Sequence, residues 1–234
     1  MHHLYAVGLD GFIPFYSFFP LNLYKANRAR VASATSSADI KDTNHVKVIL
    51  FGSILGDGQL EMPPRGKNAR FGFTQSELKK DYFISVHSSL SLICSAKYRE
   101  YSYYDKRTGK VYKTLNFWSR SLPLLTELYD LFYKDKVKKV PNDLSLLTPL
   151  ALAHWLMQDG AKGTCKGLYI CTDCFTFTDV QRLTSYLTET YNLRCSIHKA
   201  QGNYRIYILA KSVQTVRDLV LPYMHPSMLY KLGI

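Results

Sequence analysis

The chain has 234 residues, 47% of them hydrophobic, which suffices for one large or two small packed domains. Its 30 Lys and Arg against 18 Asp and Glu give a formal net charge of +12, which favours a polyanionic partner, nucleic acid ahead of an anionic membrane surface. No run of about twenty apolar residues occurs, so we expect neither a spanning helix nor a membrane partner. Five cysteines, an odd count, are typical of a reducing compartment and not of a disulfide scaffold.

Residues 1–42 are predicted to form an N-terminal extension. Residues 1–20 are aromatic and rich in turn formers, and residues 25–38 are basic, rich in Ser and Ala, and free of acids. The latter composition suits a flexible linker or part of an organelle-targeting segment. Residues 1–20 loosely resemble a fragment of cytochrome b, so the extension is expected to be exon-derived or flexible, with a domain-covering arm as the alternative.

Two apolar helices, each ending in Asp-Gly, anchor the rest of the chain. The first is expected to start after a capping residue at positions 42–44 and to run to Asp57-Gly58. The second begins at Thr148-Pro149, a capping residue followed by a proline suited to the first turn, and runs to Asp159-Gly160. Both helices are apolar on every side, which predicts that they are buried.

Each of these helices opens one copy of a repeated unit, residues 43–140 and residues 141–234. The elements expected after the helix are a strand (70–76 and 168–174), a helix (78–94 and 178–192), a hairpin (97–118 and 194–210) and a closing helix (122–133 and 212–223). One further strand is expected that the pattern does not place. Residues 134–141, short, charged and ending in proline, are predicted to link the copies. The matching tetrapeptides FTQS (73–76) and CTDC (171–174) suggest the register between them.

The two helices match one nine-residue pattern. Residues 50–58 read LFGSILGDG and residues 152–160 read LAHWLMQDG, so both resemble the LAGLIDADG motif and keep its closing Asp-Gly. An apolar helix ending in Asp-Gly is ordinary by itself, but two of them in a basic chain, each followed by the same order of elements, are not. Further local matches are KKVPNDL at 138–144, FTFTDVQRL at 175–183 and MLYKL at 228–232. From position 46 onward the chain resembles the single-chain, I-SceI-like LAGLIDADG homing endonucleases of organellar group I introns.

This resemblance implies an α+β fold in which a pseudo-twofold pair of αββαββα units carries antiparallel DNA-binding sheets. The implied function is site-specific cutting of both strands of a long, asymmetric double-stranded DNA site, which promotes intron homing. One alternative is an intron-encoded RNA maturase that assists splicing of the host group I intron. Another is a catalytically silent DNA-binding regulator, which would be expected to lose one or both acids. Because both copies lie in one chain, we expect a monomer, located in the mitochondrion or, alternatively, the chloroplast.

The acids at the helix ends are the candidate catalytic and metal-binding residues. Phosphodiester hydrolysis needs an activated water and stabilisation of a growing negative charge, and bound divalent cations supply both. Asp57 and Asp159 are suitable ligands for Mg²⁺, with Mn²⁺ as a substitute, because Mg²⁺ prefers oxygen ligands and few carboxylates. The resemblance implies the backbone carbonyls of Gly56 and Gln158 as further ligands.

Four other side chains are candidate catalytic residues. The resemblance implies that Lys138 and Lys231 hold the attacking water or offset charge in the transition state, which preplaced cations can do. Gln75 and Asp173 occupy matching places in the two tetrapeptides and are expected to position water or contact DNA near the cuts. For each lysine the alternative is a solvated surface residue, and for Gln75 and Asp173 it is an ordinary polar residue at a strand end.

The two hairpins are the candidate DNA-binding elements, because a twisted two-stranded ribbon can enter the major groove. In the first, basic residues alternate with aromatic ones; a half-buried hairpin with one solvated face is the alternative. The DNA-binding residues predicted in the first copy are Arg70, Lys97, Arg99, Lys106, Arg107, Lys110 and Lys113. Those predicted in the second copy are Arg194, His198, Lys199 and Arg205.

Two departures bear on these predictions. Gly52 and Gly56 lie on one helix face and allow close packing, but their counterparts are His154 and Gln158, so an asymmetric helix interface is expected. The spacing of Cys171 and Cys174 with Cys195 and His198 also imitates a zinc site. Against zinc, residues three apart on the predicted strand would point to opposite faces.

Overall fold

The computed structural model describes residues 37–94, 97–163 and 165–234, with side chains from residue 43. The predicted extension up to residue 36 lies outside the described residues. Residues Ser37–Ile234 form one compact unit that contains both predicted copies. Within the part that is described, no helix has the length and apolar character needed to cross a membrane.

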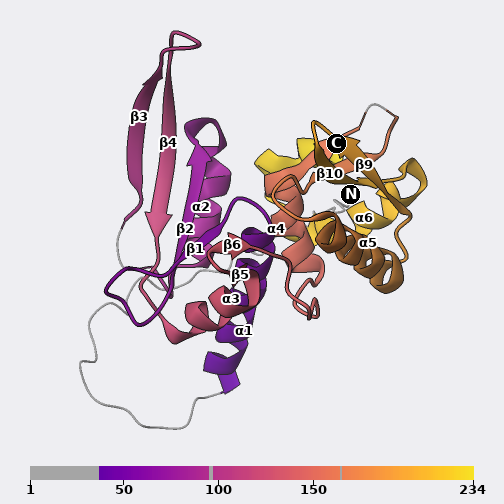
Figure 1. Cartoon of the computed structure of the whole chain (residues 1–234). Helices are drawn as coiled ribbons and strands as arrows, with labels where there is room; N and C mark the ends of the chain where they lie inside the picture. The colour runs from indigo at the N-terminus through magenta and orange to yellow at the C-terminus, as the bar shows by residue number, and fades with distance from the viewer. Residues whose placement is uncertain (1–36, 95–96, 164) are drawn as a thin grey trace, which may run out of the picture. The chain divides into compact units, whose positions relative to one another are not determined.

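The predicted αββαββα order is confirmed in both copies, and the fold is α+β (Figure 1). The first copy consists of α1 (Ser37–Leu55), β1 (Gln59–Glu61), β2 (Arg70–Ser76), α2 (Lys80–Ser89), β3 (Arg99–Asp105), β4 (Lys110–Trp118) and α3 (Pro123–Phe132). The second consists of α4 (Pro149–Asp159), β7 (Gly160–Lys162), β8 (Leu168–Cys171), α5 (Phe177–Tyr191), β9 (Cys195–Ala200), β10 (Asn203–Ile208) and α6 (Val213–Val220). The strands that the sequence did not place are β1, which directly follows Asp57-Gly58, and β7, which begins at Gly160 of the second Asp-Gly pair.

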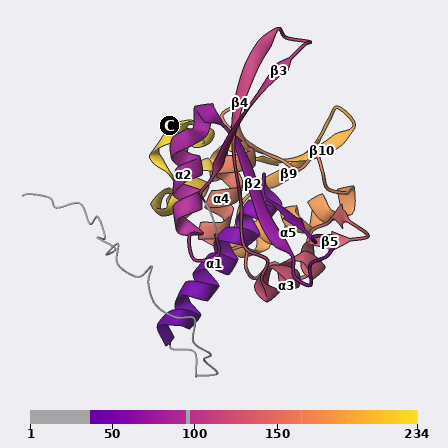
Figure 2. The same cartoon turned by 90° about the vertical axis from the view of Figure 1, so that its left-hand side faces the viewer.

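Each copy contains one four-stranded antiparallel sheet, in the orders β1-β2-β4-β3 and β7-β8-β10-β9. The alternation of side chains divides each sheet into a covered face and an outer face. Phe73 and Phe117 on the covered face of the first sheet pack against Phe83 of α2. Residues of the same strands on the outer face, such as Thr74, are exposed. The β3–β4 hairpin extends beyond the rest of the first copy (Figure 2).

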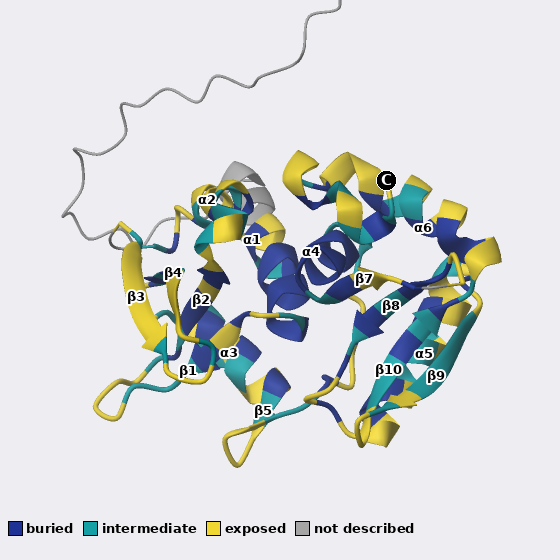
Figure 3. Cartoon of the chain, turned by 90° about the horizontal axis from the view of Figure 1, so that it is seen from above, coloured by how far each residue is buried: buried dark blue, intermediate teal, exposed yellow. Residues whose placement is uncertain are grey.

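The two motif helices α1 and α4 pack against each other between the sheets, and Figure 3 shows them largely buried. A Cβ atom at Gly52 would lie 2.0 Å from the carbonyl oxygen of Ala151, and one at Gly56 would lie 2.5 Å from Oε1 of Gln158. Gly52 in α1 therefore has no room for a Cβ atom, and one at Gly56, just after the end of α1, would displace the Gln158 side chain. The predicted asymmetry is present, because Gly56 of the first motif faces the larger Gln158 of α4.

Several boundaries differ from the predicted ones. α1 begins at Ser37, before the expected cap, in a stretch without Gly or Pro. α2 starts at Lys80 after the 3-10 turn η1 (Glu77–Lys79) and ends at Ser89, because the following Leu90 and Ile93 are drawn into the core. The last predicted helix is split into η2 (Ala210–Ser212), α6 and η3 (Leu221–Tyr223), and η4 (Pro226–Leu232) closes the chain.

The segment predicted as a plain linker contains a small hairpin, β5 (Tyr133–Lys134) and β6 (Val137–Lys138). Asp135 and Lys136 form its turn with φ of 51° and 64°, which is the conformation of a tight hairpin turn. The segment predicted to link the copies therefore contains ordered secondary structure. The hairpin has a consequence for function, since it determines the direction of the Lys138 side chain.

Candidate active site and nucleic-acid interface

The two motif acids meet at the ends of the packed helices. α1 ends at Leu55, two residues before Asp57, whereas Asp159 is the last residue of α4. Burial, followed by the charge of Asp57, raises the pKa of Asp159 to about 7. A partly buried Asp159 carboxylate whose negative charge is disfavoured by burial and by Asp57 would be stabilised by a bound cation.

Asp57 is held by side chains from two other elements. The Gln75 side chain of β2 donates from Nε2 to Oδ2 of Asp57 at 2.5 Å. The backbone N–H of Asp57 donates to Oε1 of Gln158 in α4 at 2.8 Å. The candidate residue Gln75 therefore lies at the site, on the covered face of its strand, where it is 5% exposed.

The two candidate lysines also reach the site. Lys138 Nζ donates to the carbonyl oxygens of Gly56 at 3.0 Å and Gly58 at 3.3 Å. Lys231 Nζ, from η4, donates to the carbonyl oxygen of Gln158 at 3.1 Å. Burial lowers the pKa of both ammonium groups, and the aspartates oppose that shift. Neither lysine is the solvated surface residue of the alternative interpretation.

The oxygen atoms present fit a hard divalent cation. Asp57 and Asp159 offer carboxylates, and Gly56 and Gln158 offer backbone carbonyls in the same place, as the contacts of the two lysines show. Among residues 37–94, 97–163 and 165–234, no group of three or more His, Cys, Asp or Glu is placed to hold a metal. A site with two carboxylates suits Mg²⁺, which keeps several of its waters, better than a metal that needs a full set of protein ligands.

The predicted match between Gln75 and Asp173 is wrong by one residue. Gln59 and Ala161, each two residues after its motif aspartate, pair with Gly72 and Tyr169. The counterpart of Gln75 is therefore Thr172, which is fully buried and donates to the Tyr204 carbonyl. A shift of one residue changes the face of a strand.

Asp173 lies accordingly in another environment. It accepts hydrogen bonds from Nε and Nη2 of Arg205 at 2.9 and 2.7 Å, and this contact holds the pKa of its carboxyl below the usual range. Thr172, the counterpart of Gln75, thus donates to a backbone carbonyl, whereas Gln75 donates to its motif aspartate, and the two half-sites differ in chemistry.

The second strand of the second copy is shorter than predicted, so Cys171 and Cys174 do not lie on opposite faces of one strand. β8 ends at Cys171, so Cys174 lies beyond the strand. His198 does not offer a free nitrogen: Nδ1 lies 3.1 Å from the Tyr169 hydroxyl and Nε2 lies 3.0 Å from that of Ser196. These contacts, and not the two strand faces, disfavour His198 as a zinc ligand.

The register of the first sheet separates the predicted DNA-binding residues. Arg99 pairs with Asn116, and Lys110 pairs with Asp105, on the outer face. Lys113 lies on the opposite face, in an ion pair with Glu77 at 3.6 Å. Three others, Lys97, Lys106 and Arg107, are exposed before β3 or in the hairpin turn. Arg70 is on the outer face with its guanidinium 4.3 Å from the Trp118 ring, and it donates to Glu61.

The second sheet shows the same division. Arg205 and His198 pair with each other on the outer face, whereas Lys199 pairs with Tyr204 on the other face. Arg194 is exposed just before β9. Only part of each predicted basic set therefore shares the outer face.

The sequence reasoning missed the aromatic and polar residues of that face. Tyr103 and Tyr112 stack at 5.6 Å between ring centroids in the first sheet. Tyr207 packs against both Tyr169 and His198 in the second. The alternation of the strands could have found them, but only with a correct register, which pairing between distant strands decides.

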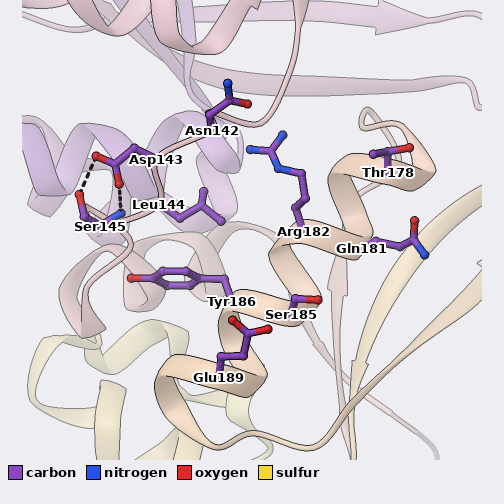
Figure 4. A pocket seen from close by; sticks show the side chains of 10 residues that line it. All are labelled: Asn142, Asp143, Leu144, Ser145, Thr178, Gln181, Arg182, Ser185, Tyr186 and Glu189. Atoms are coloured by element: carbon purple, nitrogen blue, oxygen red, sulfur yellow. Dashed lines mark hydrogen bonds between the residues drawn. The ribbon is translucent and has the colours of Figure 1, made fainter.

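A separate hollow of about 560 Å³ lies on the solvent side of α5 (Figure 4). Asp143 accepts from the backbone N–H and hydroxyl of Ser145, and Arg182 donates to Asp179 and to the Val140 carbonyl. These polar groups satisfy one another, and the lining includes none of the predicted site residues.

His154 allows a prediction about stability. It is 7% exposed and lines a cavity of about 240 Å³ together with Tyr82 and His225. Burial, and then the nearby His45, lowers its pKa to about 4 from the ordinary 6.5. Between pH 6.5 and pH 4, His154 binds a proton in the unfolded chain but stays neutral in the folded chain. The free energy of unfolding therefore decreases as the pH falls from about 6.5 to 4. We expect a loss of about 3 kcal/mol.

Urea unfolding at several pH values, with wild type and His154→Leu compared, measures this effect. The difference in the free energy of unfolding between the two proteins should change across that window. A constant difference from pH 7 to pH 4 would show that His154 does not titrate as expected.

Two pseudo-symmetric αββαββα units with paired acids at the ends of two packed helices define the architecture of a two-motif homing endonuclease. The LAGLIDADG DNA endonuclease family matches residues 47–216, and the chain belongs to this family. The solved structure of the homing endonuclease I-WcaI bound to its DNA recognition sequence is similar with a TM-score of 0.76 and 26% identity, covering 86% of this chain and 95% of that one.

Two curated relatives match over most of the chain. The cytochrome b mRNA maturase bI2 of Debaryomyces hansenii is 33% identical over 190 residues, which are 79% of this chain and 72% of that protein. The DNA endonuclease I-ChuI of Chlamydomonas applanata is 28% identical over 208 residues, which are 82% of this chain and 95% of that protein. One relative is thus named for DNA cleavage and the other for RNA maturation.

Proposed function

We propose that the chain is a site-specific, Mg²⁺-dependent endonuclease that cuts both strands of double-stranded DNA and promotes intron homing. The observation that carries this is the meeting of Asp57 and Asp159, one from each copy, between two sheets with open outer faces. One acid for each copy supports one cut for each strand. Both halves of the site lie in one compact unit, which supports action as a monomer.

Each residue at the site has a role in this proposal. The carboxylates of Asp57 and Asp159 and the carbonyls of Gly56 and Gln158 would hold Mg²⁺ or Mn²⁺, which supplies an activated water and stabilises negative charge. Gln75 orients the Asp57 carboxylate through its 2.5 Å hydrogen bond. Lys138 and Lys231 lie against the two carbonyls, and their positive charges offset the negative charge that grows on the phosphate.

The proposed substrate is a long, asymmetric DNA site. The hairpin of the first sheet has strands of seven and nine residues, and that of the second has two strands of six. Two unequal sheets would contact unequal half-sites. Asp173 is assigned to this DNA-facing set with Arg205, since the pair lies at the outer face.

The test is cleavage of a plasmid that carries the intronless exon junction. We expect linear product with Mg²⁺ or Mn²⁺ and none after the metal is removed with EDTA, because two carboxylates without a cation cannot activate the water. The same plasmid with the intron inserted is the control, since the insertion divides the site. An intact junction plasmid in the presence of either metal would contradict the proposal.

The division of the sheet faces predicts which cations matter for binding. Arg99→Ala, on the outer face of the first sheet, should weaken DNA binding and lower the salt dependence of the logarithm of the binding constant by about one unit of slope. Lys113→Ala is the matched control, because Lys113 pairs with Glu77 on the other face. Binding titrations at several salt concentrations measure both. Equal losses from the two variants would place the DNA elsewhere.

A second candidate function is RNA maturation, which the 33% identity to the maturase bI2 favours. The same relationship supports an intron-encoded protein of a mitochondrion, with the chloroplast as the alternative. Retention of both acids favours the endonuclease over a silent DNA-binding regulator. Filter binding of the host intron RNA, with Asp57→Asn as the protein, would test for a maturase role that does not need the acids.

A further inference from the structure

The backbone on either side of the two motif aspartates is held in different ways. Asp159 lies within α4, and the next residue continues the pattern, since Gly160 N–H donates to the Leu156 carbonyl. α1 has ended before Asp57. Gly56 N–H still donates to Gly52 O at 3.3 Å, and Gly58 N–H donates to Ser53 O at 2.7 Å.

The N–H of Asp57 lies between these two and is satisfied from the other copy. Its partner is Oε1 of Gln158, at 2.8 Å. The amide Nε2 of Gln158 donates to Ser53 Oγ at 3.2 Å and to Tyr82 Oη at 2.9 Å. Gln158 is 4% exposed and Tyr82 is 1% exposed, so this network is closed to solvent. A buried side chain whose donors and acceptor are all bound has a single favourable orientation.

We propose that the Gln158 side chain positions Asp57. A residue of the second motif thereby affects the rate of the strand cut that depends on the aspartate of the first motif. This rests on the proposed endonuclease function. The role is separate from that of the Gln158 backbone carbonyl, which every substitution at this position keeps. Gln158 acts through Asp57 and does not itself touch the reacting atoms.

The relationship is one-way. Gly56 is the counterpart of Gln158 in the first motif and has no side chain that could hold Asp159 in return. It also makes the room for the amide, because a Cβ atom there would lie 2.5 Å from Oε1. Asp159, inside its helix, does not need such support. Loss of the Gln158 amide should therefore affect one half-site more than the other, although Gln158 is the sequence neighbour of Asp159.

The experiment uses Gln158→Met, which keeps the length of the side chain and removes its hydrogen bonds. A duplex with the exon junction and a different label on each strand gives separate rates for the two cuts. Gln75→Ala identifies the strand cut by the Asp57 half-site, since Gln75 contacts Asp57 directly. We expect Gln158→Met to lower the cleavage rate of that strand about tenfold more than the rate of the other strand, because the loss of one buried hydrogen bond corresponds to a change of about that size. Tyr82→Phe, which leaves the Oε1 contact and the Ser53 hydrogen bond of the amide in place, should change the ratio of rates much less than Gln158→Met.

A second readout does not depend on cleavage. Hydrogen exchange of the Asp57 amide, measured by NMR, should be faster in Gln158→Met and change much less in Tyr82→Phe. If Gln158→Met does not fold, Gln158→Asn replaces it, because the shorter amide cannot reach Asp57. Equal slowing of both strands, or an unchanged Asp57 exchange rate, would overturn the proposal. If the wild type cuts neither strand but the Asp57 amide exchanges faster in Gln158→Met, the positioning role is supported and the endonuclease function is rejected.

Discussion

Asp57→Asn and Asp159→Asn are each expected to abolish double-strand cutting, with the rate on the affected strand falling by roughly a thousandfold or more. Asparagine keeps the size and one oxygen of the side chain but removes the charge that would hold a divalent cation. The two acids share one place, as the raised pKa of Asp159 beside Asp57 shows, so either change should disturb the common metal-binding region.

Conversion of supercoiled plasmid to nicked and linear forms measures this result. Asp130→Asn, an exposed position on α3, is the matched control and should cut like the wild type. Thermal unfolding separates lost chemistry from lost folding. The raised pKa of Asp159 means that its ionised form costs stability above pH 3.8, increasingly up to about pH 7. Asp159→Asn should therefore be at least as stable as the wild type at pH 8, and full linearisation by either variant would remove that acid from the site.

Gly52→Ala is expected to lower the free energy of unfolding by about 3 kcal/mol or more. The added Cβ would meet the backbone carbonyl of Ala151 at 2.0 Å, and a backbone group cannot rotate away. The two motif helices would have to separate, which would open the buried contact around Leu50 and Trp155. Because the helices carry the two acids, cutting should fall together with stability.

Urea unfolding measures the loss. Gly66→Ala, in an exposed loop where the new Cβ would lie 3.1 Å from the Pro63 ring, is the control, with an expected change below about 1 kcal/mol. Gly56→Ala should be intermediate in stability, since Oε1 of Gln158 can move away but the Gln158 Cβ, at 2.9 Å, cannot move without the backbone. A Gly52→Ala protein as stable as the wild type would mean that α1 and α4 do not approach as closely as described.

The repeated architecture was accessible from the sequence because it depends on local patterns. Apolar residues at helical spacing, the cap at Thr148, and the two Asp-Gly pairs located both motif helices and the order of elements after them. The catalytic candidates came partly from the acids at the helix ends and partly from resemblance. The structure brings Gln75, Lys138 and Lys231 to the paired aspartates.

Strand register was the main failure. The match of FTQS with CTDC was a similarity of letters, while the pairing of Ala161 with Tyr169 shows that Asp173 is displaced by one position from the Gln75 counterpart. Register also places Arg99 and Lys113 on opposite faces of the first sheet, and His198 and Lys199 on opposite faces of the second. Each of these outcomes depends on hydrogen bonds between strands far apart in the chain, and a strand's own residues do not encode which partner lies opposite.

The sequence by itself determined the two motif helices, the family and the acids, because helix periodicity, capping and motif spacing act over a few residues. Only the tertiary structure decided that the linker hairpin turns Lys138 toward Gly56, and that Gln158 binds the Asp57 amide across the helix interface. The physical reason is that these contacts join groups 82 and 101 residues apart in the chain. The Gln158 contact in addition requires α1 and α4 to lie so close that a Cβ atom at Gly52 would meet the Ala151 carbonyl oxygen.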